Sequence, residues 1–138
     1  MIQNCLPDVT KYLNLFLNHT TNVMIKLSPM LDIKAAINKL PYTKEVHVVC
    51  IKNEVKELLF IIEKGFLNNP ELIAVNLRTN QPTFHLNFEE EKITNLEYRY
   101  PLLKLIYEPN AAILKIGAFK TIAKRFAISK LDQNTHLY

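Results

Sequence analysis

The chain has 138 residues, of which 49% are hydrophobic, and it carries a formal net charge of +4 with an isoelectric point near 9.0. This composition excludes a disordered chain, and the length suits one ordinary domain or two small ones. No apolar run is long enough to span a membrane, and "MIQNCLPDVT" lacks the basic and apolar regions of a signal peptide. We therefore expect a cytoplasmic protein that contacts no membrane.

The first half of the chain predicts helices and short strands in alternation. An apolar stripe over 8–18, with Asp8 as its N-cap, predicts an amphipathic helix, and "VMIKL" at 23–27 predicts a buried strand. In "SPMLDIKAAINKL", Ser28 and Asp32 are both candidate caps, and Pro29 suits the first position of a helix that ends at Pro41.

Residues 45–65 admit two interpretations. In one, a strand is followed by a helix that Asn53 caps. In the other, Lys52 and Asn53 turn two strands of a hairpin, and the β-rich "LLFII" favours this hairpin. Alternation predicts a second hairpin over 70–91, with His85 on its polar face.

The last third of the chain predicts an irregular link over 98–110, a helical region over 110–126 and a terminal strand in "THLY". The whole pattern is that of a mixed α/β chain. Its charge is uneven, because 89–91 is Glu-Glu-Glu whereas 115–130 holds five basic residues and no acid. Positive potential should therefore gather near the C-terminus.

Lys115 does not fit one continuous helix. At about 100° per residue, a helix over 110–126 would place Lys115 within the apolar stripe, where an unpaired ammonium is costly. Either the helix breaks at Gly117, or Lys115 extends to a rim and meets an anion. The two are compatible, because a break would free backbone N–H groups beside Lys115 for an anion.

Cysteine and glycine usage limits the chemistry. Cys5 and Cys50 fit no metal-ligand spacing and predict two reduced thiols and no metal site. The two glycines, Gly65 and Gly117, form no glycine-rich turn of the kind that a doubly wound nucleotide-binding fold needs. We expect the chain to bind no dinucleotide or adenosyl cofactor by that route, and we find no Ser-His-Asp or Cys-His arrangement that indicates hydrolysis.

Three stretches resemble one family. "YEPNAAILKIGAFK" (107–120) resembles the C-terminal signature of the THUMP-like domain attached to a group of bacterial class I S-adenosylmethionine-dependent methyltransferases. "IKLSPMLDI" (25–33) is similar to a late strand and loop of their catalytic domain, and "VHVVCIKNEVKELLF" (46–60) is a third match. The matches come in the expected order and cover most of the chain.

The resemblance implies a fold in three parts. Residues 1–65 would be the end of a Rossmann-like methyltransferase sheet, 66–98 a small ferredoxin-like hairpin insert, and 99–138 a THUMP-like domain. The glycine-rich loop, the acidic ribose-binding residue and the Asp-Pro type catalytic loop of such enzymes are missing from this sequence. We therefore expect no catalytic residue here and no activity by the chain alone, with S-adenosylmethionine bound by a separate catalytic half.

The resemblance further implies that the chain holds structured RNA, such as tRNA or rRNA, for that methyltransferase. Helical RNA is bound through phosphates and shape. The candidate RNA-binding residues are Asn110, Lys115, Lys120, Lys124 and Arg125, and the loop that would border the substrate holds Ser28, Pro29 and Asp32.

Simpler roles compete with these. The basic residues would otherwise form a solvated helix face, and Asp32 would be a helix cap. An alternative function is a protein-interaction module that docks the catalytic half or an acidic partner. If 1–65 is the end of a parallel sheet, strand 23–27 lacks its inner neighbour, and we expect the isolated chain to self-associate through this exposed edge.

Overall fold

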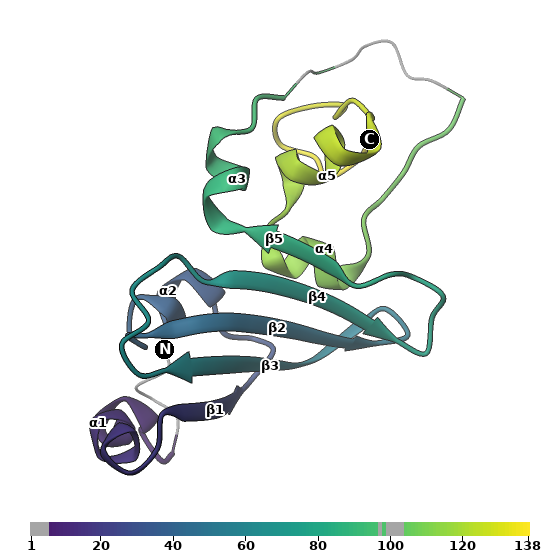
Figure 1. Cartoon of the computed structure of the whole chain (residues 1–138). Helices are drawn as coiled ribbons and strands as arrows, with labels where there is room; N and C mark the ends of the chain where they lie inside the picture. Colours follow the sequence, from purple (N-terminus) through teal and green to yellow (C-terminus); the bar gives the residue numbers. More distant parts are fainter. Residues whose placement is uncertain (1–5, 97, 99–103) are drawn as a thin grey trace.

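The computed structural model describes residues 6–96, 98 and 104–138. The elements, in chain order, are α1 (Val9–His19), β1 (Asn22–Leu27), α2 (Ile33–Ile37), β2 (Thr43–Ile51), β3 (Glu54–Glu63), β4 (Glu71–Leu77), β5 (Phe84–Asn87), α3 (Phe88–Ile93), α4 (Ala111–Ile116) and α5 (Phe119–Phe126). Figure 1 shows the strands as one sheet, with α3 and α5 beyond its β5 edge. The mixed α/β class is confirmed. No described helix is long and apolar enough to cross a bilayer.

The five strands lie in the order β1-β3-β2-β4-β5. β2 and β4 are parallel, and the other three pairings are antiparallel. β1 and β2 therefore run in the same direction, with the antiparallel β3 between them. The sheet also continues past residue 65, because β4 pairs with β2 in the parallel sense.

The hairpin interpretation of 45–65 is confirmed. β2 and β3 pair along their length, and the turn between them is formed by Lys52 and Asn53, whose φ angles are 49° and 67°. Asparagine tolerates this left-handed region better than most residues. Leu58 and Phe60 point to the core with no exposed surface. The second predicted hairpin is confirmed as β4 and β5.

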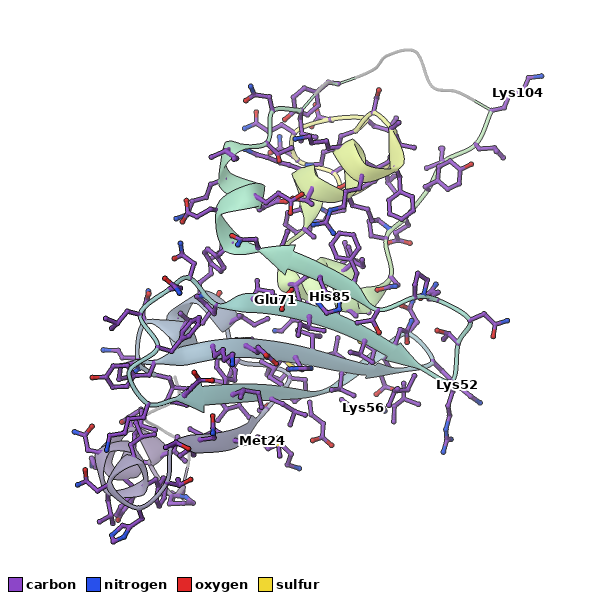
Figure 2. The ribbon with its side chains drawn as sticks, viewed as in Figure 1. Met24, Lys52, Lys56, Glu71, His85 and Lys104 are labelled. Atoms are coloured by element: carbon purple, nitrogen blue, oxygen red, sulfur yellow. The ribbon has the colours of Figure 1, made fainter. Side chains whose placement is uncertain are left out.

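One face of the sheet carries the hydrophobic core. Residues of α1, α2 and α4 pack there against inward side chains of the strands, and Figure 1 shows α2 and α4 behind the sheet. Cys50 belongs to this core, and burial raises the pKa of its thiol; Cys5 lies outside the described residues. The opposite face, which carries no described helix, presents Met24, Glu71 and His85 toward the viewer in Figure 2.

Three local expectations need correction. Residues 28–32 form a turn, so the helix begins at Ile33 with Asp32, not Ser28, as its N-cap. "THLY" forms no strand, and Tyr138 instead exchanges two backbone hydrogen bonds with Tyr107, of 2.8 and 3.0 Å. Our strand-only assignment of 70–91 also missed α3, which begins directly after β5 with Asn87 as its N-cap.

The buried Tyr138 makes stability sensitive to alkaline pH. Its hydroxyl donates to the carbonyl oxygen of Phe119 at 2.7 Å, and burial, followed by the charge of Glu91, raises the pKa of Tyr138 from 10.0 to about 12. The folded state therefore retains this proton at a pH where the unfolded state has lost it, so stability should fall as pH rises from about 10 to 12. Tyr138→Phe should flatten this decline in urea unfolding measured across that range, and an unchanged decline would contradict the assignment.

Candidate nucleic-acid interface

The predicted basic helix is two helices joined at Gly117. Gly117 has φ 75° and ends α4 in the left-handed conformation, where its N–H bonds to the carbonyl oxygen of Leu114 at 3.2 Å. A glycine reaches this conformation without the penalty that other residues carry. α4 and α5 can therefore direct their side chains independently, and the predicted break is confirmed.

Asn110 begins α4 as its N-cap. Its side-chain oxygen accepts a hydrogen bond from Ile113 N at 3.0 Å, and its Nδ2 donates to Gln81 Oε1 at 2.8 Å. Gln81 also accepts from Nδ2 of the buried Asn76, whose oxygen accepts from Asn53 N. Asn53 in turn accepts from Ala111 N at 2.7 Å. This amide network joins the β2–β3 turn, the end of β4 and the start of α4.

Removing this cap should cost stability. Asn110→Ala deletes the acceptor for Ile113 N and the donor to Gln81, so we expect the free energy of unfolding to fall by about 1 kcal/mol, within the ~0.5–2 kcal/mol range for N-caps. The exposed Asn134→Ala is the control, because no hydrogen bond of its side chain is found among the described residues. Equal midpoints for the two variants in urea unfolding would contradict a capping role.

The side chain of Lys115 forms a hydrogen bond with the backbone. Its ammonium donates to the carbonyl oxygen of Leu31 at 2.9 Å, and the residue is partly buried. The contact joins α4 to the turn that holds Ser28, Pro29 and Asp32. In that turn Ser28 Oγ accepts from Met30 N at 3.3 Å, and Asp32 accepts from Ala35 N at 2.7 Å. The structure thus brings the predicted substrate-border loop and the predicted lysine together.

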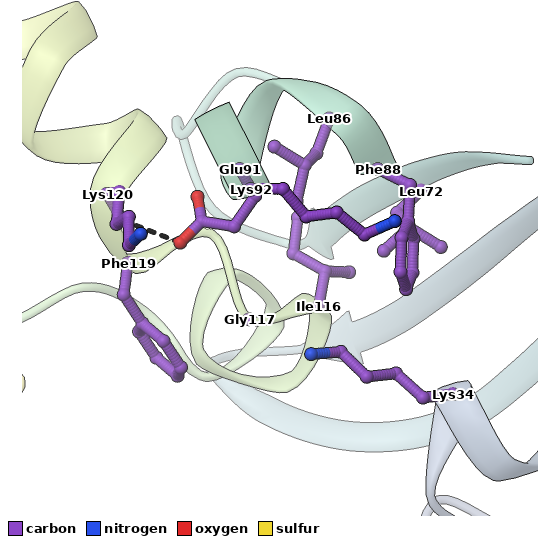
Figure 3. Close-up of a pocket in the computed structure, with 10 residues that line it drawn as sticks. All are labelled: Lys34, Leu72, Leu86, Phe88, Glu91, Lys92, Ile116, Gly117, Phe119 and Lys120. Atoms are coloured by element: carbon purple, nitrogen blue, oxygen red, sulfur yellow. Dashed lines mark hydrogen bonds between the residues drawn. The ribbon is translucent and has the colours of Figure 1, made fainter. Parts of the chain in front are cut away.

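The N-terminal end of α5 binds a carboxylate of the chain itself. Glu91, from α3, accepts a hydrogen bond from Lys120 N at 2.7 Å (Figure 3) and another from Thr121 N at 2.9 Å. A carboxylate is favourable there because free N–H groups and the helix dipole leave partial positive charge. Two of the backbone N–H groups near the break at Gly117, those of Lys120 and Thr121, are therefore satisfied within the fold.

Arg125 is likewise engaged by α3. Its guanidinium contacts both carboxylate oxygens of Glu90, at 2.6 and 3.2 Å, and donates to the carbonyl oxygen of His85 at 2.7 Å. It also lies 4.7 Å from the centre of the Phe84 ring. The pair is about a third exposed, so water screens it, but its geometry fixes Arg125 against β5 and α3.

Lys120 and Lys124 differ from the other candidates. Among the described residues, neither side chain forms an ion pair. Lys124 is exposed in the last turn of α5, and Lys120 is partly buried at the rim of a pocket. Of the predicted RNA-binding set, these two residues have side chains that form neither a hydrogen bond nor an ion pair in the described part of the chain.

The acidic side of this site was not predicted from the sequence. The Glu-Glu-Glu run at 89–91 was noted only as an uneven charge, yet Glu90 and Glu91 hold α5 in place. The buried Lys130 was also missed; its ammonium donates to the carbonyl oxygen of Gln133 at 2.9 Å. Across the described ranges, no group of three or more His, Cys, Asp or Glu is placed to hold a metal ion.

Two comparisons relate the chain to known proteins. A family model described as a ferredoxin-like domain matches residues 106–138, within the segment assigned above to a THUMP-like domain. A solved protein of Porphyromonas gingivalis W83, described as a "putative methyltransferase", is 36% identical and superposes over 99% of the chain with a TM-score of 0.91. The chain spans 35% of that protein. None of the curated proteins matches.

Proposed function

We propose that the chain is an RNA-holding accessory region of a class I S-adenosylmethionine-dependent methyltransferase, with a THUMP-like C-terminal part. One observation carries the proposal: almost the whole chain superposes on about a third of a protein described as a methyltransferase. A fold that corresponds to a minor share of such a protein suits an accessory role. The methyl donor would be bound by another part of the enzyme, because this sequence has no counterpart of the glycine-rich loop.

The positive surface that would meet RNA lies on α5. Lys124 is exposed and Lys120 lies beside it one turn earlier, so both can reach the same stretch of phosphate backbone. Lys115, Asn110 and Arg125 support this surface by fixing the start of α4, the turn at 28–32 and the body of α5. Tyr98 and Tyr107, exposed by 53% and 51%, offer faces on which unpaired bases can stack.

Binding of tRNA across a salt series tests the proposal. The logarithm of the association constant should fall linearly with the logarithm of salt concentration, because released counterions drive phosphate binding. Lys124→Glu should weaken binding and reduce the slope by about 0.7–0.9 for the lost phosphate contact. Lys39→Glu, an exposed change on another part of the fold, is the matched control. A response that is insensitive to salt, or equal effects of the two variants, would contradict the proposal.

A docking module is the second candidate, and the uncovered sheet face favours it. Met24 is 67% exposed there, and β1 lies at the sheet edge with one neighbour, β3, among the described strands. Such an edge can pair with the catalytic half, with an acidic partner or with a second copy of the chain. Pull-down of the catalytic half without RNA, and light scattering of the isolated chain, test these pairings; a monomer that captures nothing would remove this candidate.

Catalysis by the chain alone is the outcome that the proposal excludes. Calorimetric titration of S-adenosylmethionine into the isolated chain should show no heat of binding. Saturable binding would show that these residues form a donor site of their own, and the accessory role would then be wrong.

A further inference from the structure

A pocket of about 290 Å³ lies where α2, α3 and the α4–α5 connection meet the sheet (Figure 3). Its inner wall is apolar and includes Leu72, Leu86 and Ile116, which are nearly or fully buried. Its volume is at the lower end of the range of about 300–1,000 Å³ for ligand pockets. A ligand with one ring system fits such a space, whereas a dinucleotide does not.

The polar rim of this pocket is cationic. Lys34 comes from α2, Lys92 from α3 and Lys120 from α5, so the fold gathers them from three distant parts of the sequence. Lys92 is paired with Glu89 at 2.8 Å, whereas Lys34 and Lys120 form no ion pair in the described part of the chain. The one acid in the lining, Glu91, has both oxygens on the amides of α5. The net charge offered to a ligand is therefore positive.

An aromatic wall stands beside these cations. The ammonium groups of Lys34 and Lys92 each lie 5.7 Å from the centre of the Phe88 ring, and Figure 3 shows the Lys92 ammonium beside this ring. Phe119 contributes a second ring across the pocket. A flat ring packs well on aromatic and apolar walls, and clustered ammonium groups favour a doubly charged phosphate over a singly charged group.

We propose that this pocket binds one nucleoside monophosphate, with its base against the apolar and aromatic wall and its phosphate on Lys34 and Lys120. The ligand has two possible sources: a free mononucleotide, or the unpaired first nucleotide of an RNA strand that carries a 5′-phosphate. The inference does not depend on the proposed RNA role, since the free nucleotide alone would satisfy it.

The test is a titration of the full, isotope-labelled chain with adenosine 5′-monophosphate, followed by amide NMR. Saturable shifts should appear at Gly117, Phe119 and Lys120, and inorganic phosphate or adenosine alone should bind more weakly. Lys34→Gln should weaken binding about tenfold because it removes one charge-assisted contact to phosphate. Lys39 is an exposed lysine outside the pocket, so Lys39→Gln should leave the affinity for adenosine 5′-monophosphate unchanged.

A second arm uses a short single-stranded RNA with a 5′-phosphate. Shifts of the same amides with RNA but not with the mononucleotide would support the RNA source, and the reverse result would support the free ligand. The proposal is overturned if neither ligand shifts these amides at millimolar concentration, or if Lys34→Gln and Lys39→Gln bind equally. In that case tRNA binding that persists elsewhere on the chain would leave the accessory role standing.

Discussion

Truncation of Phe60 to alanine should lower the free energy of unfolding by about 3–5 kcal/mol. Phe60 lies in the middle of β3, has no exposed surface, and is the largest side chain buried to that degree. The change removes apolar area from the core and leaves a cavity between the sheet and its helices, and both effects act in the same direction. A domain of this size is stable by about 5–15 kcal/mol, so the loss is a large fraction of the total.

The control for this variant is Phe126→Ala, because Phe126 is 61% exposed at the end of α5. We expect a change within about 0.5 kcal/mol, as for most surface substitutions. Urea unfolding followed by circular dichroism gives both values. If the two variants lose a similar free energy of unfolding, the core does not lie where the structure places it.

Replacement of Glu91 by alanine should cost about 1.5–3 kcal/mol, the range for hydrogen bonds to charged groups. The Glu91 carboxylate satisfies two backbone N–H groups at the start of α5, which has no side-chain cap of its own. Without it, these N–H groups face the partly buried junction of α3 and α5, and the helix dipole loses its compensating charge.

Two variants sharpen this prediction. Glu91→Gln keeps one acceptor oxygen, so it should lose about half as much stability as Glu91→Ala. Glu89→Ala changes a neighbour whose contacts, to Lys92 and Asn69, are exposed, and it should have little effect. Equal losses of stability for Glu89→Ala and Glu91→Ala in thermal unfolding would contradict the capping role of Glu91.

The placement of Glu90 and Glu91 changes how the basic segment is understood. Arg125 and the amides at the start of α5 are bound by these two acids, so their main role in the structure is to hold α5 against α3. The ammonium groups of Lys124 and Lys120 have no hydrogen-bond or ion-pair partner in the described part of the chain. The surface proposed to meet RNA is therefore narrower than the sequence predicts, and it continues into the cationic pocket.

Local features of the fold followed well from the sequence. Alternation predicted both hairpins, and residue type predicted the cap at Asp8, the candidate cap at Asp32 and the break at Gly117. These features depend on the conformational preferences of single residues and on the spacing of apolar side chains, which a sequence shows directly.

Features that depend on contacts between residues far apart in the sequence could not be predicted from it. The parallel pairing of β2 with β4 joins segments that the β3 hairpin separates, and no local pattern specifies it. Glu91 reaches amides about 30 residues away, and Lys115 reaches Leu31, so their partners depend on the assembled fold. α3 was missed because "NFEEE" directly continues the alternating strand pattern of β5.

We propose that this fold binds a polyanion and does not bind a methyl donor. The most direct test measures tRNA affinity of the isolated chain from low to physiological salt. The account predicts binding that weakens linearly on logarithmic axes, with a smaller slope for Lys124→Glu than for the unmodified chain. No binding at low salt, or an affinity that does not change with salt, would contradict it.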